Sequence, residues 1–126
     1  TGYNKDNETN WLNFELAEVN QSLIDYYRGL IKFRKAHPAF RHATPSDYQF
    51  FDTPDSLLVG FQLGGEESQY LVYMNGSRAN TQKVTLPVGK WGVLIDGSKA
   101  AAEPIRRIRV KDLEIPPGSG MVLVKQ

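Results

Sequence analysis

The chain has 126 residues and a formal net charge of +1, with 15 basic and 14 acidic residues. This length suits one compact domain, and the near-neutral charge argues against nucleic acid as a main partner. There is no cysteine, which excludes a disulfide framework, and no apolar run approaches the roughly 18 residues that span a membrane. The sequence leaves the cellular compartment open.

Residues 1–15, TGYNKDNETNWLNFE, form a polar, asparagine-rich stretch without a repeating apolar period. Such a stretch cannot build a core of its own, so we expect another part of the protein to shape it. The chain begins on Thr1 inside this stretch, as an excised fragment would.

Residues from about 16 to 36 carry the sustained helical pattern of this sequence. Two neighbouring apolar stripes result: the first holds Val19, Leu23, Tyr26, Leu30 and Phe33, and the second holds Ile24, Tyr27 and Ile31. Polar positions and Gly29 take the remaining arc. Because the apolar arc is about half of the circumference, we expect this helix to contact two bodies. Asn20 or Asn13 is the expected cap at its start, and His37-Pro38 should end it.

After Pro38 the apolar period changes to two. The alternating segments are 48–51, 57–63, 70–75, 84–86, 91–96, 108–110, 113–115 and 121–124. Turn residues separate them, and strands spaced at about 8–12 residues with such turns are typical of an antiparallel sandwich or barrel. The predicted fold is therefore mainly β: an antiparallel β-sandwich of about eight strands, preceded by one amphipathic helix. The basic cluster of Arg106, Arg107 and Arg109 should be the solvated face of a strand.

The titratable residues do not form a recognisable reaction centre. His37 and His42 flank a proline and do not share a helical face as metal ligands would. A glycosidase requires two carboxylates about 5–10 Å apart in one cleft, and the scattered carboxylates here suggest no such pair. Asp96-Gly97 has the composition of a hairpin turn. We therefore expect no catalytic residue, metal or cofactor in this chain.

The aromatic residues of the strands are expected in the core: Tyr70, Tyr73, Trp91, Phe50, Phe51 and Phe61. An exposed pair of aromatics on one face would instead favour a sugar-binding platform. Trp11 lies in the polar stretch, where it either anchors the loop onto the helix or borders a ligand cleft.

Two motifs carry a family resemblance. Tyr3-Asn4, followed by Asn10-Trp11-Leu12-Asn13-Phe14, resembles the segment after the last barrel strand of pullulanases, the α-1,6-glucan debranching enzymes of the α-amylase clan, although Gly2 replaces the usual Ser. Residues 25–41, DYYRGLIKFRKAHPAFR, resemble the final barrel helix of that family. Leu86-Pro87, Gly89 and Trp91 through Asp96-Gly97 resemble its C-terminal β-sandwich.

The resemblance implies a division into 1–37, the last loop and helix of a truncated catalytic barrel, and 38–126, a C-terminal β-sandwich. It implies a substrate-side loop with five candidate contacts to α-glucan: Tyr3, Asn4, Asp6, Asn7 and Asn10. The parent would be a retaining hydrolase whose three catalytic carboxylates lie on earlier barrel strands. This chain alone would then be inactive, with the upstream barrel of the same polypeptide as its partner.

Two alternatives stay open. The sandwich is an α-glucan-binding module, or the parent is an α-1,4-acting or isoamylase-like member of the clan. In either case, without a barrel the helix stripe of Ile24, Tyr27 and Ile31 would be exposed, and we expect the isolated chain to self-associate or its helix to be mobile.

Overall fold

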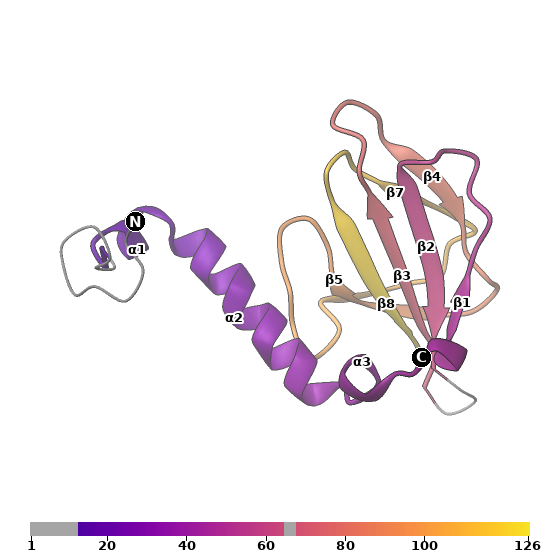
Figure 1. Cartoon of the computed structure of the whole chain (residues 1–126), viewed down its shortest axis with the longest axis horizontal. Coiled ribbons are helices and arrows are strands. Elements are labelled where there is room, and N and C mark those ends of the chain that lie inside the picture. Colours follow the sequence, from indigo (N-terminus) through magenta and orange to yellow (C-terminus); the bar gives the residue numbers. More distant parts are fainter. Residues whose placement is uncertain (1–12, 65–67) are drawn as a thin grey trace.

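The computed structural model describes residues 13–64 and 68–126 (Figure 1). Its helices are α1 (Leu16–Val19), α2 (Gln21–Ala36), α3 (Ala39–His42) and the 3-10 helix η1 (Pro45–Asp47). Its strands are β1 (Tyr48–Phe50), β2 (Leu58–Leu63), β3 (Tyr70–Asn75), β4 (Gln82–Thr85), β5 (Trp91–Ile95), β6 (Arg106–Ile108), β7 (Asp112–Ile115) and β8 (Gly120–Lys125).

The strands form two antiparallel sheets. Six of them make a sheet in the order β1-β2-β3-β8-β5-β6, and β4 pairs with β7 in a second, two-stranded sheet. Every strand pair within the described residues is antiparallel. The predicted mainly β sandwich of about eight strands is confirmed.

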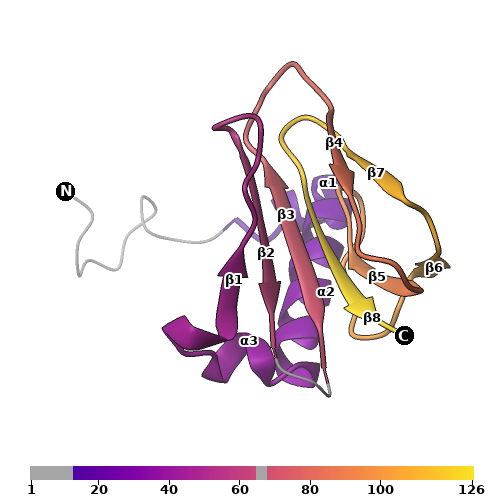
Figure 2. The same cartoon turned by 90° about the vertical axis from the view of Figure 1, so that its right-hand side faces the viewer.

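The molecule has three layers. Figure 2 shows α2 behind the six-stranded sheet, with β4 and β7 on the opposite side. An inter-sheet core fills the space between the two sheets, with Leu71, Tyr73, Trp91 and Leu123 among its members. The helix-side core lies between α2 and the large sheet and includes Phe33, Tyr70 and Leu94. Trp91, Tyr70 and Tyr73 are therefore core residues, as their strand positions predicted.

The predicted single helix over 16–36 is divided in two at Asn20. Asn20 is the N-cap residue of α2, as predicted, but its side chain donates to the backbone oxygen of Leu16 (3.0 Å) and makes no capping bond to α2. The Asn13 side chain instead accepts from the backbone N–H of Glu15. The helix ends at Ala36, before His37-Pro38, as predicted.

Candidate functional site

The predicted substrate-side loop lies outside the described residues. This applies to Tyr3, Asn4, Asp6, Asn7 and Asn10, and also to Trp11. Their role stays a prediction.

The inward face of α2 is pressed directly against the loop that follows β5. Gly29 is buried, and a Cβ built on it would overlap the backbone oxygen of Ala100. Phe33 lies one turn further and is buried in the helix-side core. The prediction that Gly29 belongs to the polar arc is wrong, because this close approach requires a residue without a side chain. A glycine inside a strong helical pattern was the signal that could have indicated it.

Polar bonds fix the same face of α2 to the sandwich. The Tyr26 hydroxyl donates to the backbone oxygen of Asp96 (2.6 Å). His37 bonds through Nδ1 to the Tyr70 hydroxyl (2.8 Å) and through Nε2 to the backbone oxygen of Ala102 (2.7 Å). Since a carbonyl only accepts, Nε2 carries a proton, and in the tautomer with the proton on Nε2 the Tyr70 hydroxyl donates to Nδ1. These bonds make α2 a fixed extension of the sandwich.

The Asp96 carboxylate organises the turn to which Tyr26 is attached. It accepts from the Arg106 guanidinium (2.7 Å), from Ser98 through its N–H and hydroxyl, and from the N–H of Lys99. Burial alone would raise the pKa of Asp96, but these bonds outweigh burial and lower the pKa to about 2. Asp96 is therefore ionised and structural.

The outward face of α2 is apolar and exposed. We define this outward face as Leu23, Tyr27 and Ile31, which follow one another at intervals of four residues, and exposed Val19 in α1 continues the same spacing. Tyr27 and Ile31 are 60% and 55% exposed, as predicted for the second stripe, whereas Ile24 is half-buried. Val19 and Leu23 were expected on the same stripe as Phe33 and instead lie on the exposed side. α2 therefore has one apolar face packed against the sandwich and one apolar face exposed to solvent.

A second exposed apolar surface lies on the edge strand β1. The rings of Tyr48 and Phe50 are stacked at 6.3 Å with an angle of 15°, and both rings contact Phe61 on β2. Phe50 is 66% exposed, so its predicted place in the core is wrong. β1 is an edge strand and lacks a neighbouring strand on one side, which leaves its side chains more exposed.

The carboxylates and histidines of the described residues are the side chains that could form a metal-binding cluster. Within 13–64 and 68–126, no three His, Asp or Glu side chains lie close enough to hold a metal ion. Asp55 has a structural role. Its carboxylate accepts hydrogen bonds from the Leu57 N–H and the Gln82 side-chain amide, and these bonds lower the pKa of Asp55. No helix in this part of the chain is long and apolar enough to cross a membrane.

No family model matches the sequence. The solved structure of the pullulanase from Bacillus acidopullulyticus superposes with a TM-score of 0.84 over 99% of this chain, at 22% identity. The chain has the fold of a pullulanase segment. Type I pullulanase from Bacillus subtilis strain 168, complexed with maltose, superposes with a TM-score of 0.73 over 92% of the chain, at 25% identity. The trehalulose synthase from Pseudomonas mesoacidophila MX-45 gives a TM-score of 0.63 over 85% at 24% identity.

These enzymes belong to the α-amylase clan, so the predicted resemblance to the C-terminal region of a pullulanase-type enzyme is supported by the fold. The chain spans 16% and 17% of the two pullulanases and 18% of the trehalulose synthase. It corresponds to a small part of each.

Proposed function

We propose that the chain is the C-terminal part of a pullulanase-like glycoside hydrolase that acts on α-1,6 branches of α-glucans such as pullulan, starch and glycogen. In this proposal it braces the catalytic barrel, and residues 1–15 supply a loop on the substrate side. The catalytic carboxylates come from the barrel, so the isolated chain is inactive.

The outward face of α2 carries this proposal. Its three apolar side chains are exposed although the opposite face of the same helix is fixed to the sandwich at Gly29 and at His37, which follows the helix. A helix that is apolar on two sides is normally covered on both. In this proposal α2 packs against the catalytic barrel with its outward face. Because its other face is fixed to the sandwich, α2 would hold the sandwich and the barrel in a fixed relative position.

The pullulanase branch is preferred over an α-1,4-acting or isoamylase-like one for two reasons. The structural match is more extensive with the two pullulanases than with the trehalulose synthase. The helix motif that resembles pullulanases also contains Gly29, for which the packing against Ala100 supplies a physical reason.

A chimera tests the proposal. The segment of the Bacillus acidopullulyticus pullulanase that superposes on this chain would be replaced by the chain, and hydrolysis of pullulan would be followed before and after heating. We expect an active chimera. Tyr27→Asp with Ile31→Asp should accelerate its thermal inactivation about tenfold or more, because charges would be buried against the barrel.

The matched control is Lys32→Asp, which introduces the same residue at an exposed polar position of the same helix. It should leave the inactivation rate of the chimera unchanged. An active chimera whose inactivation is insensitive to Tyr27→Asp with Ile31→Asp would show that the outward face does not contact the barrel.

A second candidate function is α-glucan binding by the sandwich, favoured by the exposed, stacked Tyr48 and Phe50. Aromatic rings at a surface offer flat apolar faces of the kind that cover the C–H face of a sugar. Titration with maltooligosaccharides and pullulan, read by amide NMR, should give saturable shifts at β1 that Phe50→Ala abolishes. Absence of shifts at β1 at saturating sugar would exclude this candidate, and hydrolysis by the chain would contradict its proposed inactivity.

A further inference from the structure

The two-stranded sheet covers only part of the inner face of the large sheet. Figure 2 shows β4 and β7 over the side of β8 and β5, whereas β1 and β2 extend beyond them. A cavity of about 550 Å³ opens there, between β4 and the inner surface of β2 and β3. This volume lies within the range of about 300–1,000 Å³ typical of small-molecule sites.

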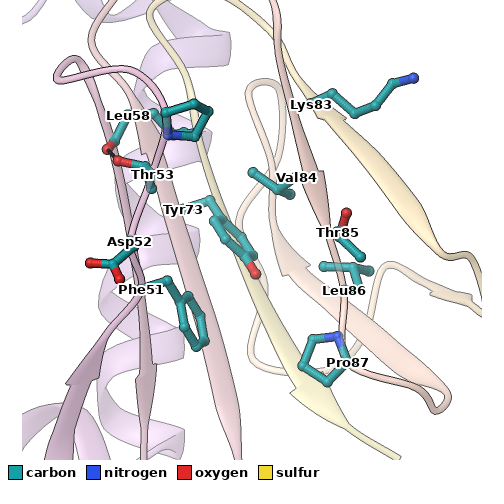
Figure 3. Close-up of a pocket in the computed structure, with 11 residues that line it drawn as sticks. Phe51, Asp52, Thr53, Leu58, Tyr73, Lys83, Val84, Thr85, Leu86 and Pro87 are labelled. Carbon is teal, nitrogen blue, oxygen red and sulfur yellow. Dashed lines mark hydrogen bonds between the residues drawn. The ribbon is translucent and has the colours of Figure 1, made fainter.

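The walls of the cavity are mainly apolar. The rings of Phe51 and Tyr73 form one side, with centroids 6.1 Å apart and an angle of 25° between their planes. Figure 3 shows Val84 and Leu86 facing them from the strand opposite. Two facing walls, one of them made of near-parallel rings, form a slot suited to a flat molecule.

One polar group faces the open space of the slot. The ring of Tyr73 is buried, but its hydroxyl is not, because no buried side-chain oxygen in the described part of the chain lacks a hydrogen-bond partner. Figure 3 shows this hydroxyl directed into the space between Phe51 and Leu86. A tyrosine hydroxyl that is open to a cavity can bond to a molecule that enters the cavity.

The other polar groups of the lining are occupied or point elsewhere. The Thr53 hydroxyl donates to the backbone oxygen of Leu58 (2.7 Å), and the Thr85 hydroxyl donates to the Asp112 carboxylate (3.1 Å). The amine of Lys83 and the carboxylate of Asp52 point away from the slot (Figure 3). The polar specificity of the cavity therefore rests on Tyr73.

We propose that this slot binds a small, flat, mostly apolar molecule of two or three rings that places one hydrogen-bonding group against the hydroxyl of Tyr73. Dry apolar cavities of about 150 Å³ hold one benzene ring, so the larger slot accommodates a larger molecule. Burial raises the pKa of Tyr73, so its hydroxyl stays neutral at pH 7 and can both donate and accept. The site is independent of the proposed role in a debranching enzyme.

The probes are 2-naphthol and naphthalene, which differ by one hydroxyl. The full chain, labelled at its methyl groups, would be titrated with each probe and followed by NMR. We expect saturable shifts at the methyls of Leu58, Val84 and Leu86, with 2-naphthol binding about two- to tenfold more tightly, the contribution of one hydrogen bond. Absence of saturable shifts at these methyls with either probe would overturn the proposal.

Tyr73→Phe keeps the ring and removes the hydroxyl. It should reduce the affinity for 2-naphthol to that for naphthalene and leave naphthalene unaffected. The matched control Tyr27→Phe, at an exposed position of α2, should change neither affinity. An unchanged preference for 2-naphthol in a folded Tyr73→Phe variant would overturn the assignment of the hydroxyl.

Discussion

The α-carbon of Gly29 lies against the backbone oxygen of Ala100, so that α2 and the loop after β5 meet without an intervening side chain. This contact lets the helix approach the sheet closely enough for Phe33 to enter the helix-side core. The contact between Gly29 and Ala100 joins two parts of the chain that are separated by about 70 residues. A substitution that disturbs this contact tests whether packing holds α2 against the sandwich.

We predict that Gly29→Ala destabilises the chain although alanine is the better helix former. The substitution gains about 1 kcal/mol of helix propensity, but the overlap with Ala100 forces α2 outward, and such overpacking costs about 1–3 kcal/mol or more when backbone must move. Denaturant unfolding should show a lower free energy of unfolding, and amide NMR should show shifts at Ala100. Arg28→Ala is the control, because Arg28 is exposed and its substitution should be neutral or slightly stabilising. A Gly29→Ala variant as stable as the wild type would refute the close contact.

The low pKa of Asp96 predicts a loss of stability in acid. Its folded-state pKa is about 2 against an ordinary value of 3.8, so the stabilisation is present above pH 3.8 and disappears as the pH falls towards 2. The difference corresponds to about 2 kcal/mol, and the side chain is only 16% exposed, so screening by solvent is limited.

Asp96→Asn should therefore be less stable than the wild type at pH 7, and the gap should close between pH 4 and pH 2. Urea unfolding across that range is the measurement. Asp25→Asn serves as the control, because Asp25 is exposed and its pair with Arg28 is long at 3.7 Å. If the gap between wild type and Asp96→Asn stayed constant with pH, the Asp96 carboxylate would not be the group that titrates.

The outline of the fold was accessible from the sequence because its signals are local. Alternation of apolar residues predicted the strands, and Trp91 was placed in the core from its strand position alone. The exposure of Tyr27 and Ile31 also followed from helical geometry. The pairing order of the strands, with β8 between β3 and β5, depends on long-range contacts that no local pattern contains.

The misplaced residues share a cause. The exposure of Phe50 depends on its position at the edge of the sheet, and the burial of Gly29 depends on a loop far along the chain. The Asp96-Gly97 turn was recognised, but Gly97 is not among the glycines with positive φ, and the Asp96 side chain holds the turn instead. The burial of these residues depends on neighbours from distant parts of the chain, and a local sequence pattern does not identify those neighbours.

The bonds of His37 predict coupling between α2 and β3. Tyr70→Phe removes the hydroxyl that donates to Nδ1 and should cost about 1 kcal/mol, whereas His37→Ala also loses the bond to Ala102 and the contact with Phe33. A double-mutant cycle on the free energy of unfolding should give a coupling of about 0.5–1.5 kcal/mol. Additive effects would mean that the bond contributes nothing measurable. The pair Tyr27→Phe and His37→Ala is the control and should be additive, since Tyr27 lies on the outward face.

The exposed outward face of α2 predicts self-association of the isolated chain. Leu23, Tyr27 and Ile31 form an exposed apolar stripe on α2, which is anchored on its other side, and such a stripe gains from contact with a second copy. Light scattering should show a mass that rises with protein concentration above that of the 14.2 kDa monomer. Tyr27→Lys with Ile31→Lys should return the mass to the monomer, and Lys32→Arg, on the polar side of the same helix, should not. A strictly monomeric wild-type chain whose α2 amides are fully protected from hydrogen exchange would contradict the prediction, because the stripe would then be stable in water without a partner.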